Sequence, residues 1–112
     1  SDRMTMMFCS FDKKPMILRL YGTAKIYHPR DSFFQEHIAS FQGSLGARQI
    51  VVMNISTVQT SCGYAVPIMD LQEERDVLTT WTKNKSKKKI EEYWVERNSK
   101  SIDGFDTEIV QK

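Results

Sequence analysis

The sequence has little of what marks secreted or membrane-spanning proteins. Its 112 residues include only 2 cysteines, which are not expected to form a disulfide framework. The net charge of +2 is too small to indicate nucleic-acid binding by itself. No apolar run approaches the ~20 residues that span a bilayer, and no signal-peptide segment opens the chain. These absences predict a cytoplasmic protein that binds neither nucleic acid nor membrane.

The residues that are present predict one folded domain over 1–112. Hydrophobic residues make up 40% of the chain and charged residues 27%, which is ordinary for a globular protein. Cys9 and Cys62 are expected to be reduced thiols, although a single bridge between them stays open. His28 and His37 form no metal-ligand spacing with the cysteines, so we expect no metal site.

Two strands are expected at the start of the chain. Met4 to Phe11 is a short apolar run typical of a buried strand. The turn-forming DKKP, Asp12 to Pro15, separates it from Met16 to Tyr27, where side chains alternate between an apolar and a more polar face. So short a connection predicts an antiparallel hairpin. Gly22 within the second strand indicates a bulge or a close backbone approach.

A helix and a third strand follow. Asp31 or Ser32 can cap a helix on which Phe34 and Ile38 repeat at helical spacing. Gln49 to Gln59 is rich in β-branched residues, which predicts a strand, and its composition favours the centre of the sheet. Three strands cannot close a barrel, so further strands are expected from outside this chain. The chain also opens almost directly on a strand, which is typical of a cut through a larger protein.

After Pro67 the pattern becomes helical. Leu71, Val77, Leu78 and Trp81 predict one helix, and Ile90 to Arg97 predict another, with Ser86 as its N-cap. The order of elements is therefore strand, strand, helix, strand, helix, helix. Antiparallel strands with an intervening helix favour a small barrel or an α+β sheet.

The third strand ends unusually, in VQTSCG. Gln59, Thr60, Ser61 and Cys62 precede Gly63, whereas a strand that only turns can do so with Asn-Gly or Pro-Gly. Four small or polar side chains in succession indicate a surface that contacts a ligand. The alternative is an ordinary strand end whose hydroxyl and amide groups are solvated.

Four segments, taken in order, resemble a branch of the pyridoxamine 5′-phosphate oxidase-like family. They are RMTMMFCSF, ILRLYGTAKIY, GARQIVVMNISTVQTSCGYAVP and RNSKSIDGF, and the QTSCG-x-x-VP and SIDG parts are the most specific. The resemblance implies a flavin-binding split β-barrel, mainly β with helices, of which this chain supplies only the C-terminal portion. Residues 1–67 would hold barrel strands with one inserted helix, and 68–112 a helical extension. The family's N-terminal strands, with much of the FMN phosphate pocket, have no counterpart here.

The resemblance further implies a homodimer that binds FMN, or a related deazaflavin, in a cleft between two barrels. The implied function is a flavin-dependent oxidoreductase of unknown substrate. A non-catalytic flavin-binding or dimeric interaction protein on the same scaffold is the alternative. The true oxidases carry an aromatic residue where this chain has Ser61 and Cys62, and a glutamine near Ile17. Vitamin B6 oxidation is therefore not inherited with the fold.

The predicted cofactor-binding residues each keep an alternative, and no catalytic pair is recognisable. Gln59, Thr60 and Ser61 are expected to donate to the flavin ring. Cys62 is either a redox thiol or, as free cysteine usually is, a small buried hydrophobe. Arg19 can serve a phosphate or carboxylate, or it is a solvated or interfacial arginine. Gly63 completes the predicted cofactor-binding set.

The lysine-rich segment KNKSKKK, residues 83–89, is the strongest charge run. Such blocks can bind nucleic acid. The acidic residues of EEYWVE follow one turn later, however, and no aromatic residues interleave the lysines. A solvated connection between two helices is the favoured interpretation.

Overall fold

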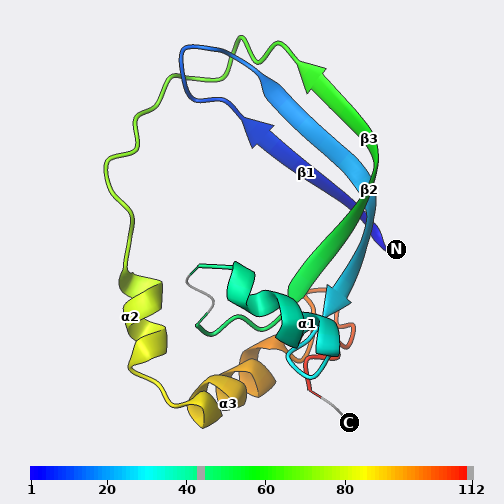
Figure 1. Cartoon of the computed structure of the whole chain (residues 1–112), viewed down its shortest axis with the longest axis vertical. Coiled ribbons are helices and arrows are strands. Elements are labelled where there is room, and N and C mark those ends of the chain that lie inside the picture. The colour runs from blue at the N-terminus through cyan, green and yellow to red at the C-terminus, as the bar shows by residue number, and fades with distance from the viewer. Residues whose placement is uncertain (43–44, 111–112) are drawn as a thin grey trace. The chain divides into compact units, whose positions relative to one another are not determined.

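The computed structural model describes residues 1–42 and 45–110 (Figure 1). Strands β1 (Arg3–Cys9) and β2 (Ile17–Tyr27) come first, followed by helix α1 (Ser32–His37) and a short 3-10 helix, η1 (Ile38–Ser40). Strand β3 (Ile50–Ser61) and helices α2 (Val77–Lys83) and α3 (Lys87–Asn98) complete the chain. None of the helices in these described ranges has the length and apolar character needed to cross a bilayer.

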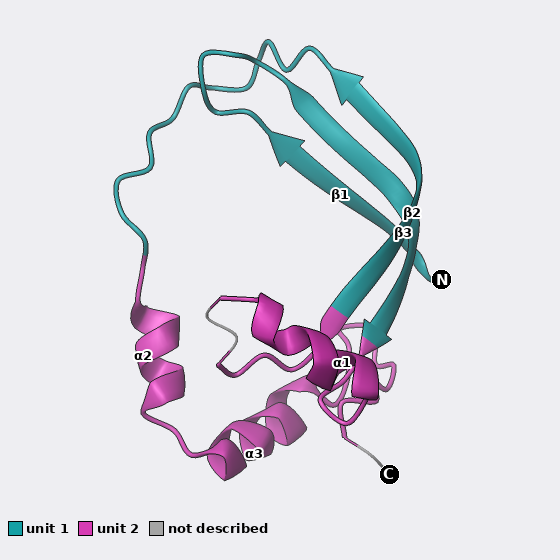
Figure 2. Cartoon of the chain, viewed as in Figure 1, with its two compact units in different colours: residues 1–26, 51–74 teal, residues 27–50, 75–112 magenta. Residues whose placement is uncertain are grey.

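The chain divides into two compact units (Figure 2). Unit 1 combines Ser1–Ile26 with Val51–Glu74 and contains nearly all of the sheet. Unit 2 combines Tyr27–Ile50 with Arg75–Lys112 and contains helices α1, α2 and α3. The helix inserted between β2 and β3 thus groups with the C-terminal helices. That 1–112 forms a single domain stays a prediction.

The sheet of unit 1 is an open, antiparallel, three-stranded sheet in the order β1-β2-β3. The predicted hairpin is confirmed, because β1 and β2 pair from Arg3 with Thr23 to Cys9 with Ile17. The expectation that the third strand is central was wrong: β2 is central and β3 lies at an edge. Its β-branched residues suit any pleated surface, and side chains such as Val58, 60% exposed, are not covered within this chain. The split barrel stays a prediction.

Gly22 lies against the backbone of β3. A Cβ atom at this position would collide with the carbonyl oxygen of Asn54 and lie 2.8 Å from its carbonyl carbon. The predicted close backbone approach is therefore confirmed. Only glycine fits here, because the obstructing atoms belong to the backbone and cannot rotate away.

Unit 2 has a small apolar core. Phe34 of α1, Ile50 at the start of β3 and Ile90 of α3 are all buried. The rings of Tyr27, Phe33 and His37 stack in succession, with centroids 4.2 and 4.0 Å apart. Segments far apart in the sequence thus supply the buried residues of this unit.

The C-terminal helices are partly as predicted. Ser86 is the N-cap of α3, and its hydroxyl accepts a hydrogen bond from the Lys89 amide at 3.3 Å. The helix expected to include Leu71 begins only at Val77, so that prediction was wrong for 71–76. Between Leu71 and Val77 no apolar residue occupies the helical spacings that would anchor a turn to a core.

Candidate functional site

Two pairs of side chains form a polar row at the end of β3. The Arg19 guanidinium of β2 donates from Nη1 to the Ser61 hydroxyl at 3.0 Å. Two residues further along β2, the Tyr21 hydroxyl donates to Oε1 of Gln59 at 3.1 Å. Alternation along each strand places these pairs on one face of the sheet. Three of the predicted site residues, Arg19, Gln59 and Ser61, are therefore brought together.

These hydrogen bonds fix what Gln59 and Ser61 can offer to a ligand. Because Oε1 of Gln59 accepts from Tyr21, its amide group retains two N–H donors. Because the Ser61 oxygen accepts from Arg19, its O–H remains available to donate. Both side chains are exposed. The row is therefore a set of outward donors, suited to a ligand edge that carries carbonyl oxygens or unprotonated ring nitrogens.

Thr60 and Cys62 do not belong to this row. A strand directs successive side chains to opposite faces, so Thr60 points away from the face that carries Gln59 and Ser61. Cys62 is a free, exposed thiol, so the alternative that it is a small buried hydrophobe was wrong. Cys9 is also free and is half-buried in β1. The strand ends at Ser61, so Cys62 lies just outside the sheet.

Gly63 is a buried residue in the turn that follows β3. Its φ is +61°, and an added Cβ atom would lie 2.8 Å from the backbone N and C atoms of Met16. Its carbonyl oxygen accepts from the Val66 amide at 2.9 Å, which closes a turn. A positive φ and a close backbone neighbour both require glycine here. The turn holds the end of β3 against the start of β2, which positions the polar row.

A hollow of about 350 Å³ in unit 1 is lined by residues of all three strands, Tyr21 among them. Paired positions in β1 and β2 put Thr5 opposite Tyr21 and Arg3 opposite Thr23. The Ser56 hydroxyl, from β3, donates to the Tyr21 carbonyl at 3.1 Å. The lining is thus rich in hydroxyl groups with one guanidinium, a chemistry that suits an oxyanion.

Sequence reasoning missed Tyr21 as a site residue. Its signal was its place two residues after Arg19 on the same face of β2, which makes it a neighbour of whatever Arg19 contacts. The acidic partners expected for the lysine run are present, because Lys87 and Lys88 lie 4.0 and 3.9 Å from Glu91 and Glu92, one turn on. The run is not simply a connection between helices, however, since Lys83 ends α2 and Lys87 begins α3.

The two histidines both lie in unit 2. His28 is buried, and His37 stacks on Phe33, with its Nδ1 atom 2.9 Å from the Phe33 carbonyl oxygen. In the part of the chain that the structure describes, no cluster of three or more His, Cys, Asp or Glu side chains suits a metal ion.

Comparison with known proteins finds a relative of this chain. The chain is 32% identical, over 120 aligned residues, to the pyridoxamine 5′-phosphate oxidase family protein ustO of Aspergillus flavus. The alignment covers 94% of this chain and 48% of the relative. This chain belongs to the pyridoxamine 5′-phosphate oxidase family. It spans about half the length of the curated relative it matches. No family model and no solved structure matches it.

Proposed function

We propose that this protein is an FMN-binding member of its family and that Gln59 and Ser61 contact the flavin ring. Members of the family commonly bind flavin. The observation that carries the proposal is the row of outward donors at the end of β3, where Tyr21 and Arg19 engage the acceptor atoms of Gln59 and Ser61. The isoalloxazine ring presents two carbonyl oxygens and unprotonated nitrogens, which require such donors. Thr60 faces the other way and is not part of the proposed contact.

The proposed activity is that of a flavin-dependent oxidoreductase. A bound flavin supplies hydride and electron transfer, and the protein contributes binding and orientation. Gln59 and Ser61 would hold the ring by hydrogen bonds. Arg19 fixes the Ser61 hydroxyl and brings positive charge to the same face. The hollow lined by Arg3, Thr5 and Ser56 offers room for an anionic group of the substrate beside the ring.

A titration with FMN tests the contact. The double variant Gln59→Ala with Ser61→Ala should weaken FMN binding by about tenfold or more, because each lost hydrogen bond costs ~0.5–1.5 kcal/mol. The fold should persist, since both side chains are exposed. Thr60→Ala is the matched control and should leave the affinity unchanged. Equal affinities of double variant and wild type would reject the contact.

Bleaching of the bound flavin tests activity separately. Addition of a reduced nicotinamide without oxygen should remove the visible flavin absorption if the protein transfers hydride. A protein that binds FMN but is not reduced in this way, or by another two-electron donor, would be a non-catalytic flavin-binding protein.

We also propose that the protein forms a homodimer through β3. Edge strands with exposed apolar side chains readily pair with another chain. Val51, Ile55 and Val58 of β3 are 42%, 49% and 60% exposed. Light scattering at micromolar concentration should give twice the chain mass, and Val58→Lys should give the monomer. Val77→Lys, at an exposed valine of α2, is the control and should keep the dimer. A wild-type monomer would refute this proposal.

A further inference from the structure

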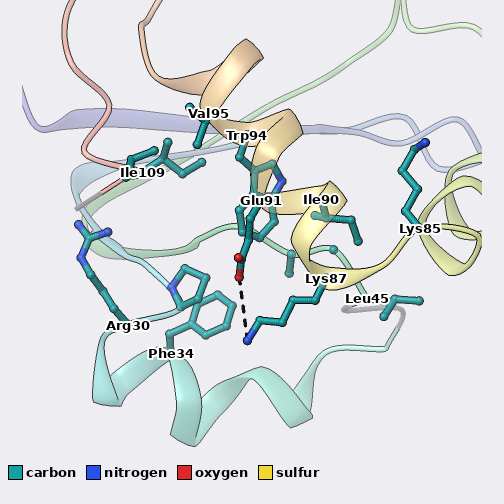
Figure 3. Close-up of a pocket in the computed structure, with 14 residues that line it drawn as sticks. Arg30, Phe34, Leu45, Lys85, Lys87, Ile90, Glu91, Trp94, Val95 and Ile109 are labelled. Carbon is teal, nitrogen blue, oxygen red and sulfur yellow. Dashed lines mark ion pairs between the residues drawn. The ribbon is translucent and has the colours of Figure 1, made fainter. Parts of the chain in front are cut away.

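Unit 2 contains a pocket of about 920 Å³, and none of its lining residues belongs to the polar row (Figure 3). Its volume is in the range of small-molecule sites. Most of its wall is apolar, and two aromatic rings are included. The walls come from α1, the segment before β3, α3 and the C-terminal segment, through Phe34, Leu45, Ile90, Trp94 and Ile109.

Three cations and one carboxylate also line this pocket. Figure 3 shows Arg30 and Lys85 at opposite sides of the view, with Lys87 and Glu91 between them. Lys87 lies 4.0 Å from Glu91, and Lys85 lies 4.9 Å from the centroid of the Trp81 ring. Two of the cations therefore already have an anionic or aromatic partner.

Arg30 differs from the two lysines. Its Nη2 atom donates to the Glu108 carbonyl at 2.7 Å and lies 3.4 Å from Nδ1 of His28. The Glu108 carbonyl is an uncharged acceptor, so this contact does not neutralise the guanidinium. No carboxylate of residues 1–42 and 45–110 forms an ion pair with Arg30. The contacts of Nη2 hold the exposed guanidinium in place. Nη1 and Nε remain available for a carboxylate or phosphate.

The C-terminal wall of the pocket is fastened by the same arginine. Glu108 adopts φ +56°, a conformation that is rare for a residue other than glycine. Its amide donates to Oδ1 of Asp106 at 2.9 Å, and its carbonyl accepts from Arg30. These contacts hold Ile109 and Val110 at the wall. Backbone strain of this kind persists only where the surroundings fix it, and it is frequent at ligand sites.

We infer that this pocket binds a small molecule with an aromatic or aliphatic body and a single anionic group, which Arg30 recognises. The apolar walls accommodate the body, while the guanidinium pairs with the anion. An excess of cations over the one carboxylate favours an anionic over a neutral ligand. The inference does not depend on flavin binding, because its residues lie in unit 2.

Nuclear magnetic resonance of the labelled chain, titrated with 1-naphthoate, tests this inference. The protein has 2 tryptophans, so each indole N–H gives its own signal. Trp94 lines the pocket, and Trp81 is not among its described lining residues. The Trp94 signal should shift on titration, while that of Trp81 should move much less. The uncharged analogue 1-naphthamide should bind about tenfold more weakly or worse, because it lacks the charge-assisted hydrogen bonds.

Three variants test whether Arg30 supplies the positive charge that binds naphthoate. Arg30→Gln should weaken naphthoate binding about tenfold more than it weakens naphthamide binding, because loss of the contact with the Glu108 carbonyl affects both ligands whereas loss of the charge affects only naphthoate. Arg97→Gln is the matched control, because Arg97 lies on α3 outside the pocket lining and pairs with Glu96 at 3.1 Å. Leu45→Glu adds a negative charge to the pocket lining, so it should weaken the binding of naphthoate more than that of naphthamide. The fold should persist, because the Leu45 side chain is 55% exposed. Dispersed spectra of each variant show that it is folded.

The inference is overturned if naphthoate and naphthamide bind equally, or if only the Trp81 signal shifts. Displacement of naphthoate by FMN would also overturn it, since the pocket would then belong to the flavin site. Loss of FMN binding in the Gln59→Ala and Ser61→Ala variant, with naphthoate binding intact, would show that the two sites are independent.

Discussion

Replacing Gly22 with alanine should destabilise the sheet of unit 1 by about 3 kcal/mol or more, at the upper end of the cost of overpacking. The added methyl group would overlap the Asn54 carbonyl oxygen and lie 2.8 Å from the carbonyl carbon. Relief requires β2 and β3 to separate, because neither atom belongs to a side chain that can rotate. Since a domain is stable by only ~5–15 kcal/mol, this single substitution should lower the urea midpoint visibly.

The measurement should distinguish the unfolding of unit 1 from that of unit 2. Trp81 and Trp94 lie in α2 and α3, so tryptophan fluorescence follows the unfolding of unit 2, while circular dichroism follows the strands as well. Gly104→Ala is the control, because Gly104 has φ +83° but no atom within 4 Å of an added Cβ. It should cost only the ~1–2 kcal/mol of left-handed backbone strain. A Gly22→Ala variant no less stable than Gly104→Ala would show that the close approach has no energetic consequence.

The features that could be predicted from the sequence are those that depend on neighbouring residues. The hairpin of β1 and β2 follows from two strand patterns joined by DKKP, and the start of α3 follows from Ser86 and the residues after it. Gly22 could be interpreted because a glycine inside a strand often marks a bulge or a close backbone approach. In the hairpin and the helix start, the signal and the structure lie within a few residues of each other.

The features that could not be predicted depend on pairing across the chain. Composition alone does not distinguish a central strand from an edge strand that awaits a partner, so β3 was misplaced. The predicted helix reached back to Leu71 because Leu71 is apolar, although the residues between Leu71 and Val77 give a helix no anchor to a core. The pocket in unit 2 is formed by Arg30, Trp94 and Ile109, which no local pattern connects.

The candidate site contains one feature that could be predicted from the sequence and one that could not. The sequence identifies the polar residues after Val58 as a group, yet the two-residue period of a strand separates Thr60 from Gln59 and Ser61. That separation was available from the sequence. The pairing of Ser61 with Arg19 and of Gln59 with Tyr21 was not, because it depends on how β3 lies against β2. The structure therefore changes the candidate set from a continuous run into two pairs.

Gly63→Ala should reduce both stability and FMN affinity, because Gly63 holds the end of β3 in place. Its φ of +61° would cost an alanine ~1–2 kcal/mol, and the approach of the new Cβ to within 2.8 Å of the Met16 backbone adds a cost of ~1–3 kcal/mol. We expect a total loss of roughly 2–5 kcal/mol, measured by urea unfolding against Gly104→Ala, which shares the positive φ without the contact.

The effect of Gly63→Ala on the ligand distinguishes positioning from simple loss of fold. Met16 directly precedes β2, so a shift at Gly63 displaces Ser61 from Arg19 while most of the β1–β2 ladder can remain. FMN binding of the folded fraction, titrated at low temperature without denaturant, should therefore be weaker than in wild type. Cys62→Ala is the matched neighbour: its side chain is exposed, outside the strand and without a role in the proposed contact, so it should change neither quantity. If Gly63→Ala lost stability but bound FMN as tightly as Cys62→Ala, the turn would support the sheet alone. The polar row would then not depend on the position of Gly63.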